Sequence, residues 1–460
     1  MSTPNRLYFG DCLDVMKQYV EDETVDLIYL DPPFNSKRIY NANMGGAQFV
    51  AFADTWKWYE AVDDFHEVAQ NVRMADTMEG LRRILGEGSN LAYVSYMANR
   101  LLECYRVLTH KGTLYLHCDP VMNYLLRIVL DAIFTDHKGR AFQNEFRNEI
   151  VWFYPDTPGR PKKDFPRKHD TIFRYVKSKS GYIFNADDIR VPILEASKKR
   201  YESPRVLGGR EYTGGESASI GKIPENVWRI PSVKRNSNQS CGYDTQKPVA
   251  LLDRIVRASS NKNSIVMDPF CGCGTTLEVA HGLDRNWIGI DVCVKACQVI
   301  QERFEGSFDS VWSDSSVDII GMPKTVKDAY AMAEMDPFKF EKWAASLTPW
   351  MEANKKQRGD GGIDGRGRYP LKKGTFVDMV CQVKGGHTSP SHIQAFNGAR
   401  QQAHADMGIF TCFQDRVTDG MKDAAASAGS YLGAPIIQIY TVEDFFEHRN
   451  PKYPQRHLAT

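Results

Sequence analysis

The stretch SIVMDPFCGCGTTLEVAHGLDRNWIGID, residues 264–291, decides the fold. Its first five residues form a short apolar run typical of a buried strand, and the glycine-rich turn Asp268–Thr276 follows. A helical segment through Gly282 then leads to a second apolar run at 287–291. A doubly wound parallel sheet repeats strand, turn, helix and strand in this order, and it binds ligands beyond the carboxyl ends of its strands. The sequence therefore predicts an α/β fold with a ligand crevice at this turn.

The chemistry of the turn favours a cofactor that carries positive charge. Gly272 and Gly274 let a ligand approach the backbone closely, and Asp291, 23 residues after Asp268, is placed to accept hydrogen bonds from ribose hydroxyls. The glycines do not form GxGxxG, and Asp268 would repel a pyrophosphate, so NAD does not fit. An ammonium group would be attracted to Asp268, and S-adenosylmethionine (SAM) fits. For this stretch taken alone, a tight turn that binds no ligand is the alternative.

A second motif, Asp31-Pro32-Pro33-Phe34, follows the apolar run VDLIYL at 25–30 and is expected at the same edge of the sheet. The amino group of a nucleobase is a poor nucleophile because its lone pair is delocalised into the ring. A carboxylate from Asp31 and the carbonyl of Pro32 would accept both N–H groups and stabilise the positive charge that grows during methyl attack. Pro33 has no N–H that competes for this carbonyl, and Phe34 offers a flat face to an extruded base. We expect these four residues to be catalytic; taken alone, the motif reads better as a turn that ends a strand.

Composition restricts the class of protein. The 460 residues suffice for about three domains of roughly 150 residues, and 42% hydrophobic with 25% charged residues excludes a collagen-like or disordered chain. No apolar run approaches the ~20 residues of a membrane helix, and the first residues contain no apolar signal core, so we expect a cytoplasmic protein with no membrane partner. The 10 cysteines lack CxxC spacing, and we expect reduced thiols.

DPPF at 31–34 together with DPFCGCGTT at 268–276 resembles the DNA amino-methyltransferases that make N6-methyladenine or N4-methylcytosine. Because DPPF comes first, the order resembles the circularly permuted beta group. FGDC at 9–12, TQKP at 245–248 and WIGID at 287–291 resemble three further elements of that family. The resemblance implies a class I SAM-dependent methyltransferase that acts on a flipped base of double-stranded DNA, with adenine N6 favoured over cytosine N4. The cofactor-binding residues indicated are Asp11, Lys247, Asp268, Pro269, Phe270, Gly272, Gly274, Thr275 and Asp291.

Positive charge is concentrated between Arg147 and Lys247, where 20 Lys and Arg stand against 12 Asp and Glu, a local +8 in a chain of net charge +1. Pro, Gly, Lys and Arg dominate this segment and periodicity is poor, which predicts a separate loop-rich module. In the permuted family the target-recognition segment lies at this place. We expect the module to bind DNA phosphates. The candidate residues are Arg160, Lys162, Lys163, Arg167 and Lys168.

A third group of candidates lies near the C-terminus. Asp364 precedes Gln382 and Lys384 by about 20 residues, and Glu341 stands on the preceding predicted helix. Mg²⁺ prefers carboxylate and carbonyl oxygens, so Glu341, Asp364 and Gln382 are candidate metal ligands, with Lys384 orienting a hydroxide or stabilising charge during catalysis. The pattern resembles the PD-(D/E)xK superfamily, in particular the Mrr-like restriction endonucleases, with Gln in place of the second acid.

We therefore expect a methyltransferase catalytic half at 1–146, a basic target-recognition module at 147–246, a cofactor half at 247–310, a linker at 311–325 and an Mrr-like nuclease domain at 326–460. The predicted function is site-specific DNA methylation in a restriction-modification system, with a fused Mg²⁺-dependent endonuclease. Two alternatives stay open: a methyltransferase whose C-terminal domain grips DNA without cleaving it, and a SAM-sensing DNA-binding regulator that flips no base. A homodimer is also left open.

Overall fold

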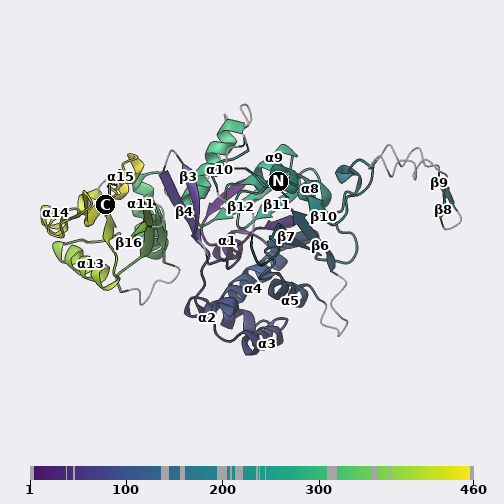
Figure 1. Ribbon diagram of the computed structural model, residues 1–460, viewed down its shortest axis with the longest axis horizontal. Coiled ribbons are helices and arrows are strands. Elements are labelled where there is room, and N and C mark those ends of the chain that lie inside the picture. Colours follow the sequence, from purple (N-terminus) through teal and green to yellow (C-terminus); the bar gives the residue numbers. More distant parts are fainter. Residues whose placement is uncertain are drawn as a thin grey trace.

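The computed structural model describes residues 5–37, 39–44, 47–135, 145–155, 161–193, 205–207, 210–212, 221–234, 237, 239–243, 245–307, 319–354, 361–372 and 375–455. Within these ranges, a nine-stranded, mostly parallel sheet forms the centre of the molecule (Figure 1). Only β7 runs antiparallel to its neighbours. This confirms the predicted α/β fold class. The spatial order is β10 (Val227–Arg229), β6 (Phe146–Phe153), β7 (His169–Val176), β5 (Leu108–Cys118), β2 (Val25–Leu30), β11 (Ile265–Asp268), β12 (Asn286–Asp291), β1 (Arg6–Phe9) and β13 (Ile319–Ile320).

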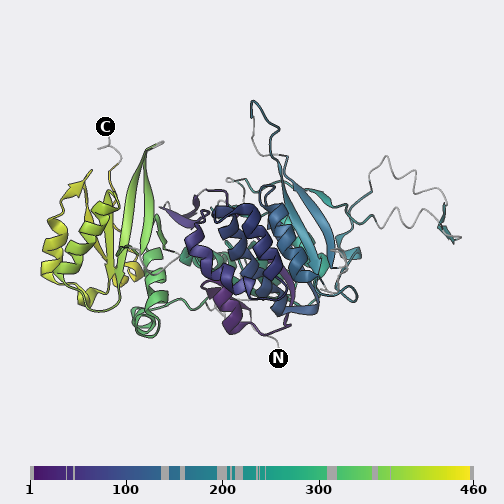
Figure 2. The ribbon, with the colours of Figure 1, turned by 90° about the horizontal axis from the view of Figure 1, so that it is seen from below.

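Helices cover both faces of this sheet. Successive strand residues point to opposite faces, so Leu27 and Tyr29 join one apolar core while Ile28 and Leu30 join the other. The first core is covered by α8 (Val249–Ser259), α9 (Thr275–Gly282) and α10 (Val294–Ser307). The second is covered by the dark helices that lie together in Figure 2: α1 (Cys12–Tyr19), α2 (Trp58–Ala69), α3 (Ala75–Leu85), α4 (Ser89–Val107) and α5 (Asn123–Phe134).

Segment 147–246 differs from the separate loop-rich module that the sequence predicts. Strands β6, β7 and β10 extend the central sheet beyond β5, and β7 pairs with β5 from Thr171 to Val176. The strands escape sequence analysis because they alternate with irregular, charged connections, such as 161–168. A small hairpin, β8 (Arg205–Leu207) with β9 (Arg210–Tyr212), is also present in this segment.

The C-terminal domain is a second α/β unit. Its five-stranded sheet has the order β14 (Met351–Ala353), β15 (Gly365–Lys372), β16 (Thr375–Lys384), β17 (Met407–Cys412) and β20 (Ile437–Thr441). Its helices are α11 (Val326–Met335), α12 (Pro337–Ser346), α13 (Pro390–Gln402), α14 (Asp419–Ala426) and α15 (Val442–Phe446). None of the helices in the described ranges combines the length and apolar character needed to cross a bilayer. All ten cysteines are free thiols.

The two units share an apolar core. Phe340 and Trp343 of α12 are buried in the same cluster as Leu7 and Phe9 of the central sheet. The hairpin β3 (Ile39–Met44) and β4 (Ala47–Ala53), which follows the DPPF motif, packs with β4 against β14. Figure 1 shows this hairpin between the central sheet and the C-terminal domain. The C-terminal domain is therefore packed directly onto the cofactor half.

Candidate active site

The two sequence motifs meet at one edge of the central sheet. Strand β2 lies parallel to β11, with Ile28 opposite Met267, so Asp31 and Asp268 leave neighbouring strands at the same end. Both line one cavity of about 500 Å³. The expected juxtaposition of the two strand ends is confirmed. The predicted residues that line this cavity are Asp11, Asp31, Pro33, Lys247, Asp268, Pro269, Phe270, Gly272, Thr275 and Asp291.

The carboxylate of Asp31 has one occupied and one open oxygen. Oδ2 forms an ion pair with the ammonium of Lys247. Oδ1 is buried and has no hydrogen-bond partner. The imidazole of His117 lies beside it, with Nδ1 3.7 Å from Oδ1, while Nε2 lies 3.1 Å from Oδ2 of Asp170. A buried acceptor without a donor is unfavourable, so this corner is suited to a ligand that donates N–H.

The loop that carries Asp31 is held by a residue that sequence analysis missed. Asp54 is fully buried, and its carboxylate accepts hydrogen bonds from the backbone N–H groups of Phe34, Asn35 and Ser36 at 2.6–3.1 Å. Asn35 has φ 58°, a left-handed conformation that Asn tolerates. Asp54 lies in no recognisable motif. It fixes the loop of Pro32 and Phe34, and the Phe34 ring lies 5.6 Å from the ring of His117.

Two further carboxylates give the cavity an excess of negative charge. Asp268 accepts hydrogen bonds from Thr276 Oγ1 at 2.6 Å and from the Phe270 N–H at 3.1 Å. Burial raises the pKa of Asp268 to about 7, although these two bonds lower it, and the negative charges of Asp31 and Asp291 raise it further. Burial likewise raises the pKa of Asp291 to about 6. A cationic ligand would favour the ionised state of both carboxyl groups, and two carboxylate acceptors fit the ammonium and the ribose hydroxyls of SAM.

The glycines of the turn have different roles. Gly272 has φ 52°, lines the cavity and donates its N–H to Asp291 Oδ2 at 2.8 Å. Gly274 has φ 77°, and a Cβ there would stand 2.7 Å from Cγ1 of Ile300. The missing side chain of Gly274 therefore allows α9 to pack against α10, a role in packing that the sequence analysis did not assign to it.

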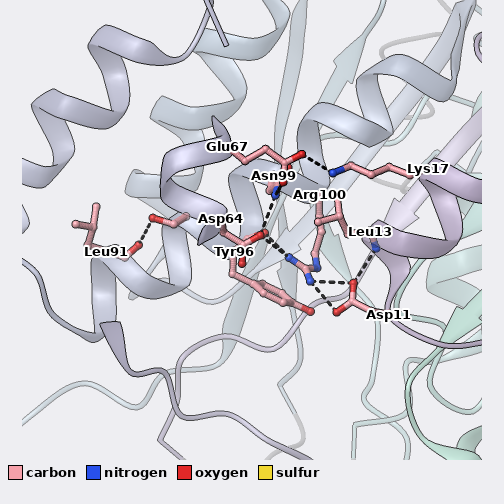
Figure 3. A network of polar contacts seen from close by, with 10 residues as sticks. Asp11, Leu13, Lys17, Asp64, Glu67, Leu91, Tyr96, Asn99 and Arg100 are labelled. Carbon is pink, nitrogen blue, oxygen red and sulfur yellow. Dashed lines mark hydrogen bonds and ion pairs between the residues drawn. The ribbon is translucent and has the colours of Figure 1, made fainter. Parts of the chain in front are cut away.

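The lining of the cavity also includes a network around Arg100 (Figure 3). Asp11 caps α1 by accepting the Leu13 N–H at 2.8 Å. Nη2 of Arg100 donates to both oxygens of Asp11, at 2.7 and 2.8 Å, and Nη1 lies 3.5 Å from Asp64. Burial would raise the pKa of Asp11, but the charge of Arg100 keeps it below its usual value. Asp11 is thus ionised and fixed in position. The network continues through Asn99, Glu67 and Lys17.

The predicted DNA-binding residues lie on the connection between β6 and β7. Lys162, Lys163 and Arg167 are exposed, and Lys168 donates from Nζ to the Pro155 carbonyl at 3.0 Å. Arg160 lies outside the described residues. This connection leads into Asp170, which contacts His117 beside Asp31. The three exposed cations therefore belong to the connection that ends at Asp170.

The candidate residues of the C-terminal domain gather around β16. Asp364 Oδ2 accepts the Val383 N–H at 2.6 Å, and Gln382 Nε2 donates to the Gly362 carbonyl at 2.9 Å. Burial raises the pKa of the Cys381 thiol, and the charges of Asp364 and Glu341 raise it further. Lys384 ends the strand. In the described ranges, no three His, Cys, Asp or Glu side chains are arranged to hold a metal ion.

Comparison with known proteins finds DNA methyltransferases that resemble part of the chain. The chain is 28% identical over 308 residues to the type II methyltransferase M.HpaI of Haemophilus parainfluenzae, covering 66% of this chain and 75% of that protein. It is 29% identical over 283 residues to the DNA adenine methyltransferase YhdJ of Escherichia coli K12, covering 62% and 76%. Among solved structures, the cytosine-N4-specific PvuII DNA methyltransferase aligns with a TM-score of 0.40 at 15% identity, covering 66% of this chain and 87% of that one.

Two family models match different parts of the chain. Residues 338–447 match a family described as NACHT-associated inactive restriction endonuclease 1. Residues 25–302 match the family described as N6_N4 DNA methylase. The second match spans more than half of the chain and includes both strand-end motifs. The chain therefore belongs to the N6/N4 DNA methylase family.

Proposed function

We propose that this protein transfers a methyl group from SAM to the exocyclic amino group of a base flipped out of double-stranded DNA, with adenine N6 as the target. The observation that carries the proposal is the open, buried Oδ1 of Asp31 at the edge of an acidic cavity. Adenine is favoured because YhdJ, one of the similar proteins, is described as an adenine methyltransferase.

One group of residues binds the cofactor and another binds the target base. Asp268 and Asp291 hold the cofactor, which supplies the reactive methyl group when bound. Asp31 Oδ1 accepts one N–H of the target amino group, and the Pro32 carbonyl accepts the other. Both acceptors direct the nitrogen lone pair out of the ring and stabilise the positive charge that develops on nitrogen. Phe34 stacks on the extruded base.

Asp31→Ala is the direct test. We expect the variant to bind SAM but to incorporate no labelled methyl group into unmethylated plasmid DNA. Asp63→Ala, which removes an exposed carboxylate from α2, is the control and should methylate normally. Methylation by Asp31→Ala would refute the catalytic assignment. A wild-type protein that binds SAM and DNA but transfers no methyl group would support the SAM-sensing regulator instead. Mass spectrometry of the hydrolysed product DNA separates N6-methyladenine from N4-methylcytosine.

For the C-terminal domain we propose DNA binding without cleavage in preference to Mg²⁺-dependent hydrolysis. Asp364 and Gln382 are engaged in hydrogen bonds to the protein backbone, and replacement of an acid by Gln382 lowers the charge available to a divalent cation. The matching family is described as inactive. Incubation of the protein with Mg²⁺ and unmethylated plasmid tests this. Cleavage that is lost in Asp364→Ala would restore the endonuclease assignment for Glu341, Asp364, Gln382 and Lys384.

A further inference from the structure

The cavity is not closed by the methylase domain alone. Helix α12 of the C-terminal domain contributes Phe338, Lys339 and Lys342 to its lining, and the segment after that helix contributes Thr348 and Asn354. These residues lie beyond residue 302, where the match to the DNA methylase family ends. The cofactor cavity of this protein therefore has an outer wall that the methylase domain does not supply.

A series of contacts connects this wall to Asp291, the carboxylate expected to bind the ribose. The Gly10 N–H donates to the Asp291 carbonyl at 3.0 Å, at the end of β1. A Cβ on Gly321 would stand 2.9 Å from both the Phe9 carbonyl and the ammonium of Lys339. Lys339 of α12 therefore lies close to the end of β1, where Phe9 is paired with Asp291 of β12.

The wall offers groups that match an adenine ring. Phe338 of α12 is 46% exposed and Val292, directly after Asp291, is 52% exposed, although both line the cavity. A flat aromatic ring bound there would cover this apolar surface. Lys342 of α12 lines the same cavity as Asp11 and Asp14, so its ammonium is available to the hydrogen-bonding edge of a bound ring.

Thr348 gives a second, independent indication of a ligand. Its side chain is 1% exposed and lines the cavity, yet Oγ1 has no hydrogen-bond partner. A buried hydroxyl without a partner costs about 1–3 kcal/mol. A polar group of a bound molecule would satisfy it.

The wall is built into the fold. Phe340 and Trp343, on the same helix, are buried in the apolar core that also contains Phe9. Moving α12 away from the cavity would expose this core to water. Helix α12 therefore holds its position relative to the cofactor half instead of acting as a loose lid.

We propose that α12 is part of the cofactor site, with Phe338 covering the adenine ring and Lys342 facing its edge, so that the C-terminal domain sets the affinity for SAM. This rests on the proposed binding of SAM in the cavity.

Calorimetric titration of the full-length protein with SAM tests the proposal. Phe338→Ala and Lys342→Met should each weaken binding by about tenfold. Lys342→Arg should restore most of it. The matched controls are Met335→Ala and Lys327→Met, which alter exposed residues of α11 outside the cavity lining and should bind as wild type does. Wild-type affinity in both test variants would overturn the proposal.

Hydrogen exchange gives a readout that needs no substitution. SAM should slow exchange in residues 336–354 as well as in the turn 268–276, and leave α14 unchanged. Protection of 268–276 without protection of 336–354 would refute the role of α12 while leaving the proposed function intact. No protection in either segment would refute both.

Discussion

Lys247 and Asp31 form an ion pair across 216 residues of sequence. The pair occupies Oδ2 of the proposed catalytic carboxylate and leaves Oδ1 without a hydrogen-bond partner. It also joins the TQKP element to the DPPF loop. A single positive charge thus balances Asp31 in a cavity that already contains Asp268 and Asp291.

Lys247→Met should lower the rate of methyl transfer by about tenfold or more, because it leaves Asp31 without its counter-charge in a partly buried site. Lys247→Arg keeps the charge and should retain most of the activity. Single-turnover methylation with saturating SAM measures the effect. Equal rates for Lys247→Met and wild type would show that the pair contributes nothing to catalysis.

Asp54→Ala should destabilise the protein by about 3 kcal/mol, since it leaves the N–H groups of Phe34, Asn35 and Ser36 without their acceptor. Urea unfolding followed by fluorescence measures this change. Methylation should fall even at temperatures where the variant stays folded, because the catalytic loop loses its fixed position. Substitutions of surface residues usually change the free energy of unfolding by less than about 0.5 kcal/mol. A change no larger than this in Asp54→Ala would contradict the role of Asp54 in holding the loop.

Affinity for SAM should fall as the pH is lowered below about 7. The pKa of Asp268 is raised to about 7, mainly by burial, so at lower pH this carboxyl must lose its proton before it can pair with a cation. One such group gives a slope of at most about tenfold per pH unit.

The same titration can be shifted by substitution. Thr276→Val removes a hydrogen bond that lowers the pKa of Asp268, so the midpoint of the pH profile should move upward. Thr411→Val, which removes an unpaired buried hydroxyl in the C-terminal domain, is the matched control. The range from pH 5.5 to 8 extends about one pH unit or more to each side of the expected midpoint. An affinity for SAM that stays constant over this range would show that Asp268 does not pair with the cofactor.

Combined substitution of Lys162, Lys163 and Arg167 by Ala should weaken DNA binding and reduce its dependence on salt. Each lost phosphate contact lowers the slope of log K against log salt by about 0.9. The control replaces Lys111, Lys179 and Lys262, exposed residues at the opposite end of the central strands. Equal slopes in both triple variants would exclude a role of the β6–β7 connection in phosphate binding.

Local sequence was sufficient to predict the strands whose ends form the edge of the cavity. Strand β2 spans Val25–Leu30 as predicted, because a parallel strand covered on both faces gives a continuous apolar run. The position of Asp31 and Asp268 at one edge of the sheet followed from the rule that parallel strands present their carboxyl ends at the same edge. Strands β6 and β7 were missed because an antiparallel extension of the sheet depends on partners far away in the sequence.

The sequence by itself determined the fold class, the two motifs and the acidic character of the cofactor site, since each depends on neighbouring residues and on the alternation of polar and apolar side chains. The tertiary structure alone decided that Asp54 fixes the loop after Asp31, that Arg100 holds Asp11, and that α12 lines the cavity. These contacts join residues far apart in the chain, and each depends on the burial and orientation that only the packed protein creates.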